Sequence, residues 1–132
     1  MGLPAAKQGD QIIATDTHIV MIPAPPGSPI PTLLPNPFMG IINGGLSSNV
    51  KIMGMSAATV DSTASNLPPH IPQGGPFQKA PSNKATIKMG STTVKINGKM
   101  AARNGDMAMT CNDPSDLPIG KVVAVGTVMV GG

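Results

Sequence analysis

Apolar and polar positions alternate over short runs along this chain, and glycine and proline separate the runs. The clearest runs are Ala85-Thr86-Ile87-Lys88-Met89 and Lys121-Val122-Val123-Ala124-Val125. Clusters of β-branched residues in short runs of this kind are typical of strands. No stretch of a dozen residues shows the three- and four-residue apolar spacing of a helix without an interrupting glycine or proline. The pattern therefore predicts an all-β protein with many turns.

Three pairs of these runs flank turn residues and are predicted to form β-hairpins. The arms and turns are 38–42 and 46–52 around Asn43-Gly44-Gly45, 85–89 and 92–96 around Gly90-Ser91, and 122–125 and 127–130 around Gly126. Glycine supplies the positive φ that a tight hairpin turn requires. Each predicted hairpin ends in the same pattern, Val-x-(Ile/Val)-x-Gly, which begins at Val50, Val94 and Val128.

A longer sequence repeat contains this pattern and recurs along the chain. Residues 47–58 and 91–102 agree at seven of twelve positions after a shift of 44 residues, and Pro4-Ala5-Ala6-Lys7 is a partial third copy that matches Met100-Ala101-Ala102-Arg103. Internal repetition indicates equivalent structural units. Because the third hairpin ends the chain and the third Ala-Ala copy begins it, we expect three units that close in a ring. The predicted fold is a pseudo-threefold arrangement of hairpins with adjacent termini.

Two segments rich in proline and glycine, residues 22–37 and 67–78, lie outside the repeat. The first contains seven prolines, and proline cannot donate a backbone hydrogen bond within a central strand. We predict a stiff extended surface loop; the alternative is a polyproline ligand for a partner, but the charge that often flanks such ligands is absent. The second segment is predicted to be a rigid loop and contains His70.

Composition limits the size of the core. A chain of 132 residues is expected to form a single domain over residues 1–132. It has no Trp or Tyr, and Phe38 and Phe77 are its two aromatic rings apart from histidine. Large rings therefore cannot dominate the buried area. So thin a core would gain stability from a bound metal or a partner subunit.

Charge and cysteine content narrow the functional classes. The net charge of +3 comes from Lys and Arg scattered singly, without the basic cluster and aromatic stacking platforms typical of nucleic-acid binders. The single cysteine, Cys111, cannot form an intrachain disulfide, which fits assembly in a reducing compartment. The N-terminus has no signal-peptide pattern, and no apolar run approaches the length of a membrane span.

The repeat also brings metal-capable residues into register. His18 lies twelve residues after Ala6 and His70 twelve after Ala58, while Cys111 lies nine after Ala102. In a threefold arrangement these side chains converge near the axis, and His and Cys are preferred ligands of structural Zn²⁺, which can supply folding free energy. The open fourth position could be taken by Asp16, Asp113 or water. Taken singly, an isolated histidine is more often a surface or core residue than a ligand, and a lone cysteine such as Cys111 is usually a small buried hydrophobe.

Catalytic patterns are weak. Cys111 with His18 or His70 could form a thiol nucleophile and its base, and Asp10 and Asp106 could be read as paired carboxylates. Both aspartates directly follow a glycine, which suits an Asx-type turn better. No phosphate-binding glycine loop, nucleophile elbow or His-Glu-x-x-His motif is present. We therefore expect a protein that is not an enzyme.

The segments Pro4-Ala5-Ala6-Lys7-Gln8-Gly9-Asp10 and Met100-Ala101-Ala102-Arg103-Asn104-Gly105-Asp106 resemble the Pro-Ala-Ala-Arg motif of PAAR and PAAR-like proteins. These are spike tips of bacterial contractile injection systems, including type VI secretion, extracellular injection particles and related phage tails. The resemblance implies a cone of β-hairpins whose base caps a trimeric β-helical spike protein of the VgrG type. It also implies one structural zinc near the apex, which by position would be held by His18, His70 and Cys111. The chain departs from the pattern in lacking a third histidine and in having Lys7, Ser56 and Thr59, so only one copy keeps Ala-Ala-Arg.

The resemblance leads to a ranked set of functions. The first is a structural spike tip that sharpens the device for puncture of a target membrane. The alternative is an adaptor for effector cargo that uses loops 22–37 and 67–78, and a small zinc enzyme ranks below both. The chain is expected to carry no fused effector domain, to be made in the bacterial cytoplasm, and to act at the tip of an injection particle delivered outside the cell or into a target.

Overall fold

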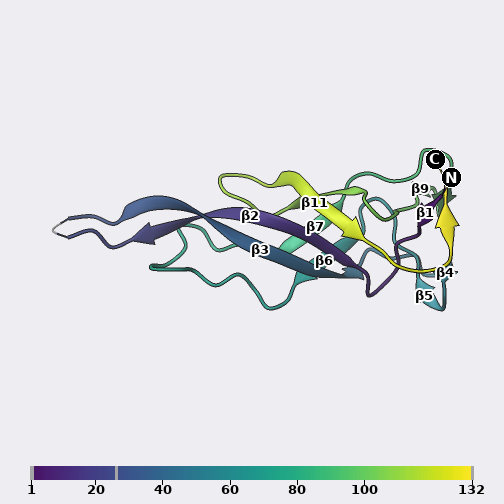
Figure 1. Ribbon diagram of the computed structural model, residues 1–132, viewed down its shortest axis with the longest axis horizontal. Helices are drawn as coiled ribbons and strands as arrows, with labels where there is room; N and C mark the ends of the chain where they lie inside the picture. Colours follow the sequence, from purple (N-terminus) through teal and green to yellow (C-terminus); the bar gives the residue numbers. More distant parts are fainter. Residues whose placement is uncertain (1, 26, 132) are drawn as a thin grey trace.

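The computed structural model describes residues 2–25 and 27–131, and within them the chain consists of strands and loops without a helix. The strands are β1 (Leu3–Pro4), β2 (Gln11–Ile22), β3 (Ile30–Gly44), β4 (Lys51–Ile52), β5 (Met55–Ser56), β6 (Thr63–Asn66), β7 (Lys84–Ile87), β8 (Lys95–Ile96), β9 (Lys99–Met100), β10 (Met107–Thr110), β11 (Leu117–Val123) and β12 (Met129–Val130). They assemble into a cone, with the β2–β3 hairpin at the tapered end and both termini at the broad end (Figure 1). The predicted all-β cone is confirmed. No helix in the described ranges is long and apolar enough to cross a membrane.

The middle of the cone is a closed barrel of six strands in the order β10-β11-β2-β3-β6-β7. β2 and β3 pair along their whole shared length, from Gln11↔Ile41 to Ile22↔Ile30. β11 pairs with β2 only at residues 11–13, and β6 pairs with β3 only from Gly40 onward. The distal part of the β2–β3 hairpin therefore projects beyond the barrel and forms the narrow end (Figure 1).

Three two-stranded sheets, β4–β5, β8–β9 and β12–β1, form the broad end. In the third sheet Val130 pairs with Leu3 and Met129 with Pro4, so this unit joins the two ends of the chain. The sequence prediction of three repeat units that close in a ring, with one unit divided between the termini, is confirmed.

Backbone hydrogen bonds between alanines close this ring at its centre. The N–H of Ala6 donates to the carbonyl of Ala102, Ala102 to Ala58, and Ala58 back to Ala6, at 2.9, 3.1 and 3.0 Å. The neighbouring bridges repeat the cycle at Ala5↔Arg103, Lys7↔Ala57 and Thr59↔Ala101. The six alanines are each no more than 2% exposed. Small side chains on the pseudo-threefold axis therefore allow three backbones to approach within hydrogen-bond distance.

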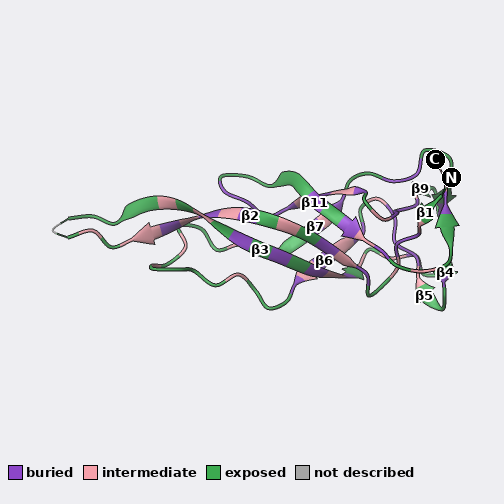
Figure 2. Ribbon diagram, viewed as in Figure 1, coloured by how far each residue is buried: buried purple, intermediate pink, exposed green. Residues whose placement is uncertain are grey.

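Apolar side chains pack on both sides of the alanine ring. A basal cluster consists of Ile52, Ile96 and Val130 from the three small sheets, with Ala5, Ala57 and Ala101. The larger cluster fills the barrel and includes Phe38, Ile12, Ile42, Ile87 and Val122. Figure 2 shows that buried residues alternate with exposed ones along β3 and mostly with intermediate ones along β2. Phe38 is the largest fully buried side chain, so the core is as poor in aromatic rings as the sequence indicates.

The predicted pairing of the hairpin arms was wrong. Residues 85–89 do not fold back on 92–96, because β7 pairs with β6 and β10. Likewise β3 pairs with β2 and β6 rather than with residues 46–52, and residues 122–123 pair with β2 rather than with 127–130. The repeated phrase instead folds on itself with its turn at Met53-Gly54 or Asn97-Gly98. Both residues of each turn have positive φ, between 51° and 83°, as the two-residue turn of a tight hairpin requires.

The prediction for the first proline-rich segment, residues 22–37, was also wrong in part. Residues 30–37 belong to β3 and pair with β2, and a loop joins the two strands at the tapered end. Proline is tolerated there because this part of β3 is an edge strand. Residues 67–78 lie outside the strands as predicted, with one bridge from Phe77 to Val20.

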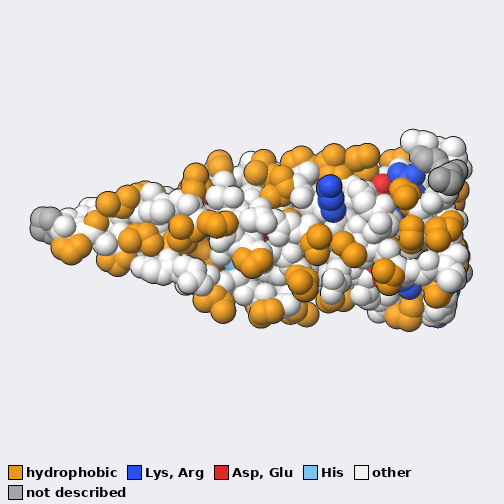
Figure 3. Space-filling model, viewed as in Figure 1, with side chains coloured by type: hydrophobic (Ala, Val, Ile, Leu, Met, Phe, Trp, Pro, Cys, Tyr) orange, Lys and Arg blue, Asp and Glu red, His pale blue; other side chains and the backbone are white. Residues whose placement is uncertain are grey.

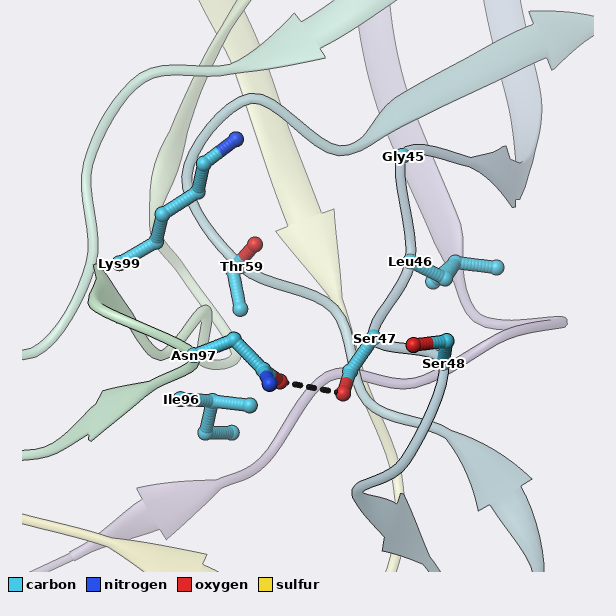
Figure 4. A pocket seen from close by; sticks show the side chains of 8 residues that line it. All are labelled: Gly45, Leu46, Ser47, Ser48, Thr59, Ile96, Asn97 and Lys99. Carbon is cyan, nitrogen blue, oxygen red and sulfur yellow. Dashed lines mark hydrogen bonds between the residues drawn. The ribbon is translucent and has the colours of Figure 1, made fainter.

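Contacts between neighbouring repeat units complete the base. The Ser47 hydroxyl hydrogen-bonds the Asn97 side chain at 2.6 Å across a pocket between the 45–48 loop and the β8–β9 sheet (Figure 4). At the corresponding position of the next unit, the Ser91 hydroxyl donates to the carbonyl of Gly131. In the remaining unit Met53 Sδ lies 3.5 Å from the Thr127 nitrogen. Each turn thus contacts an adjacent unit, and the three contacts form a cycle.

Candidate metal centre

Four potential metal ligands converge between the barrel and the projecting hairpin. Asp16 and His18 are two residues apart on β2 and therefore lie on the same face of that strand. Cys111 directly follows β10, and His70 lies in the loop after β6. Each ligand residue thus comes from, or just beyond, a barrel strand.

The four side chains lie close enough to share one ion. One ligand atom from each of Asp16, His18, His70 and Cys111 lies within 4.8 Å of the other three. Asp16, His18 and Cys111 are no more than 3% exposed as residues, and the imidazole of His70 is 2% exposed. Buried charged and polar groups are stable only when they are paired, hydrogen-bonded or bound to a metal.

Asp16 is the hub of this cluster. Its Oδ1 accepts a hydrogen bond from the Thr110 hydroxyl. Its Oδ2 lies 2.8 Å from Nε2 of His70 and accepts a weak hydrogen bond from the Cys111 thiol at 3.4 Å. One carboxylate oxygen is therefore held by the protein, while the other faces both the imidazole and the sulfur.

His18 has the least satisfied side chain of the cluster. Among the buried side-chain nitrogen and oxygen atoms of the described residues, Nδ1 and Nε2 of His18 are those without a hydrogen-bond partner. Nδ1 lies 3.5 Å from Oδ2 of Asp113, which is beyond hydrogen-bond geometry. Leaving buried polar atoms unpaired costs about 1–3 kcal/mol each. A metal ion bound to the imidazole would remove part of this cost.

His70 is oriented by asparagines. Its Nδ1 lies 3.2 Å from the Asn66 amide nitrogen, and its backbone N–H donates to Oδ1 of Asn83 at 2.8 Å. The imidazole also packs against neighbouring rings, with centroids 5.0 Å from His18 and 6.0 Å from Phe38. These contacts fix the ring so that Nε2 faces Asp16.

The environment of Cys111 favours the neutral thiol. Burial, together with the nearby carboxylate of Asp16, raises the thiol pKa to about 11, although the backbone N–H groups of Asn83 and Lys84 act in the opposite direction. An activated cysteine nucleophile needs a lowered pKa. The geometry therefore does not favour the thiol–imidazole catalytic pair considered from the sequence. A cation bound beside the sulfur would reverse the balance and favour the thiolate.

The structure brings the three predicted ligands together, and the contacts of Asp16 and Asp113 distinguish these two candidates for the fourth ligand. Asp16 belongs to the cluster. Asp113 lies beside it, but its Oδ2 accepts the backbone N–H of Ile19 at 2.8 Å. The Asp113 carboxylate therefore satisfies a backbone N–H at the edge of β2, and Asp16 is the better placed fourth ligand.

Asp10 and Asp106, considered above as paired carboxylates, occupy turns. Asp106 accepts the backbone N–H of Arg103 and pairs with its guanidinium at 2.9 Å. This hydrogen bond raises the pKa of Arg103. Asp10 pairs with Lys7 in the same way at 3.1 Å. Both aspartates thus stabilise the repeat turns, as the preceding glycines indicated.

Residues that support the ligands were missed from the sequence. Thr110 donates to Asp16, and the Asn112 amide donates in turn to the Thr110 hydroxyl at 3.1 Å. Asn66 contacts His70. One signal was available: Asn112 lies ten residues after Ala102, as Asp16 lies ten after Ala6. Equivalent positions of two repeat units therefore hold Asp16, a member of the cluster, and Asn112, which supports it.

The donor set fits a structural zinc ion. Two imidazoles, a thiolate and a carboxylate are all established Zn²⁺ ligands, and four protein ligands would leave no open position for a substrate. The unpaired nitrogens of His18 and the mutual approach of the four ligand atoms meet the requirement from the protein side.

Comparison with known proteins identifies one family. The model of the PAAR motif matches residues 38–114, which is more than half of the chain and includes two complete repeat units, His70 and Cys111. A search of curated proteins gives no match.

Proposed function

The chain belongs to the PAAR-motif family of spike-tip proteins, which sit at the tip of contractile injection machinery, and we propose that its broad base caps a trimeric spike protein of the VgrG type while its tapered end leads into the target membrane. The observation that carries this proposal is the internal threefold symmetry of the base. One chain with three equivalent units can match a three-chain partner without a symmetry mismatch.

Three exposed valines occupy equivalent positions in the three repeat units of the base. Val50, Val94 and Val128 directly precede β4, β8 and β12, and their carbonyls accept equivalent hydrogen bonds from Ala57, Ala101 and Ala5. The three valines are similarly exposed, at 36%, 36% and 40%. Exposed apolar positions related by symmetry fit an interface that buries all three together.

The tapered end has a different chemistry. No Asp, Glu, Lys or Arg occurs between Thr17 and Val50, and the imidazole of His18 is buried. On the face shown in Figure 3, Lys and Arg lie toward the broad end, whereas apolar side chains continue to the narrow end. Charged side chains are costly inside a bilayer. An uncharged leading end therefore supports a role in membrane puncture.

Binding to the spike protein tests the capping proposal. The variant Val50→Asp/Val94→Asp places two charges on the base and should weaken binding to the trimeric spike at least tenfold, about 1.4 kcal/mol. The control Ile30→Asp places a charge at a more exposed site, 57% against 36%, on the distal hairpin and should bind normally. Equal binding by all three proteins would exclude the base as the capping surface.

We further propose that Asp16, His18, His70 and Cys111 hold one structural zinc ion. Zinc would join β2, the end of β10 and the loop after β6, and so supply stability that the small core lacks. Metal analysis should find about one zinc per chain. Asp16→Asn should lower zinc affinity at least tenfold, while the matched variant Asp113→Asn should retain the metal because Asp113 caps a backbone N–H. The reverse order would make Asp113 the ligand, and zinc retained in Cys111→Ser would remove Cys111 from the set.

A second candidate function, cargo loading, is favoured by one observation. A groove of about 490 Å³ runs between β3 and the 66–73 segment, with Met39, Leu67 and Ile71 each more than half exposed along it. If effector cargo binds this groove, Met39→Glu/Ile71→Glu should abolish cargo loading and leave capping intact. Normal loading by this variant would argue against the groove.

A further inference from the structure

Over residues 30–38, on the side that faces away from β2, the edge of β3 has no strand beside it, and the 66–73 segment lies across a groove from residues 35–39. β6 pairs with β3 only from Gly40 onward, and the N–H of Met39 donates to the Asn66 side chain. Within residues 2–25 and 27–131, no strand pairs with this edge before that point. Open sheet edges offer their backbone groups to other chains.

The opposite edge of the same hairpin, on β2, is covered by loops. The N–H of Met21 donates to the carbonyl of Pro76, and the N–H of Gln78 donates to the carbonyl of Ile19, at 2.8 and 2.9 Å. Nearer the barrel, the N–H groups of Thr17 and Ile19 donate to the side chains of Asn112 and Asp113. The fold thus satisfies the backbone of one edge with hydrogen bonds and leaves the other open.

The pairing register shows which residues of β3 face outward along the open edge. Thr17, Ile19 and Met21 direct their N–H groups away from β3. In an antiparallel ladder the directly opposed residue then directs its own N–H away as well. The opposed residues are Pro35, Leu33 and Pro31, and Pro37 follows in the same alternation opposite Thr15. Proline therefore occupies three of the four outward positions between 31 and 37, and Leu33 retains an N–H.

The surroundings of this edge would otherwise favour strand addition. Ile30 and Leu33 are 57% and 59% exposed, and the edge carries no formal charge. A long, uncharged, apolar edge strand is an aggregation site unless some feature blocks pairing. Proline blocks pairing because it lacks the N–H donor and its ring obstructs the approaching strand.

We propose that Pro31, Pro35 and Pro37 keep the distal edge of β3 from pairing with the same edge of a second copy of this chain. Pairing of two copies there would be antiparallel and would extend each two-stranded hairpin into a four-stranded sheet. This inference is independent of the capping and metal proposals, because it rests on backbone direction and exposure in the hairpin.

The test restores the missing donors. Pro31→Thr/Pro35→Thr/Pro37→Thr introduces residues with good strand propensity, and the variant should self-associate, so that light scattering on a sizing column gives at least twice the monomer mass. The control Pro23→Thr/Pro25→Thr/Pro72→Thr changes three exposed prolines outside the edge and should remain monomeric. Far-UV circular dichroism confirms that each variant is folded; if the triple variant unfolds, Pro35→Thr alone serves in its place.

Two further measurements locate the association. Adding Leu33→Lys to the triple variant places a charge on the edge and should restore the monomer. The Leu33 amide should exchange with solvent rapidly in the wild-type chain and at least tenfold more slowly in the associated variant. A folded triple variant that stays monomeric would overturn the proposal, as would association that also occurs in the control or that persists with Leu33→Lys.

Discussion

Replacing Ala58 with leucine tests the closure of the three repeat units most sharply. Ala58 is fully buried and both donates to and accepts from the other two alanines of the ring, Ala6 and Ala102. Leucine adds three carbon atoms at a point where three backbones are within hydrogen-bond distance of one another. The added atoms must either be accommodated by strain or force the ring to open.

Strain and ring opening would each lower the stability by a similar amount. Overpacking of a well-packed core costs about 1–3 kcal/mol. Opening the ring instead loses three backbone hydrogen bonds, each with a net value of about 1 kcal/mol. The free energy of unfolding should therefore fall by about 3 kcal/mol, which corresponds to a Tm lower by roughly 12 °C for a chain of this size.

Calorimetry at a fixed zinc concentration measures this loss. The matched control Ala80→Leu lies at an exposed loop position and should change stability by less than about 0.5 kcal/mol. Because the ring is cyclic, Ala6→Leu and Ala102→Leu should destabilise the protein as much as Ala58→Leu. If Ala58→Leu were as stable as the control, or if the three positions behaved very differently, the alanines would not share a packed axis.

Two further predictions concern buried ionisable groups. Arg103→Thr alone should cost about 3 kcal/mol in urea denaturation, because it leaves the Asp106 carboxylate buried without its partner. The double variant Arg103→Thr/Asp106→Ser copies the neutral Thr59 and Ser62 pair of the second unit. It should recover most of that lost stability. A double variant as unstable as Arg103→Thr alone would contradict this prediction. The pKa of Cys111 is raised from 9.0 to about 11, so the folded chain binds its proton more tightly than the unfolded chain. The stability of the metal-free protein should therefore fall as pH rises from about 9 to about 11. Cys111→Ala should remove that part of the pH dependence, and an identical pH profile for both proteins would show that the thiol is not buried as described.

The sequence predicted the number and order of repeat units better than it predicted their strand partners. Recurrence of the Ala-Ala phrase is a local signal, and it led directly to the ring that includes both termini. The partners of residues 85–89 and 122–123, however, lie far away in the chain. Short apolar runs beside glycine can pair with any strand of suitable length, so adjacency in sequence was a poor guide.

In the proline-rich segment, the loop prediction used the number of prolines and ignored their spacing. Seven prolines between residues 22 and 37 led to the prediction of a loop. The prolines at 31, 35 and 37 share one parity, which places them all on the open side of an edge strand. Alternation would have distinguished an edge strand from a loop, because a strand allows proline only where no N–H is needed.

The candidate metal cluster was predicted only in part, because its last member depends on long-range contacts. Repeat register placed His18, His70 and Cys111 together, but it left Asp16 and Asp113 as equal candidates. What distinguishes them is a long-range contact, since the Asp113 carboxylate accepts the N–H of Ile19 while Asp16 turns toward His70. Such a choice depends on packing between elements that no local spacing reports.

The stoichiometry of the complex with the trimeric spike protein tests the central claim most directly. Native mass spectrometry of the purified complex should give one copy of this chain for three copies of the spike protein, because the three internal units already supply the threefold base. A complex with three copies of this chain per trimer, or the absence of a complex between the two folded partners, would contradict the account.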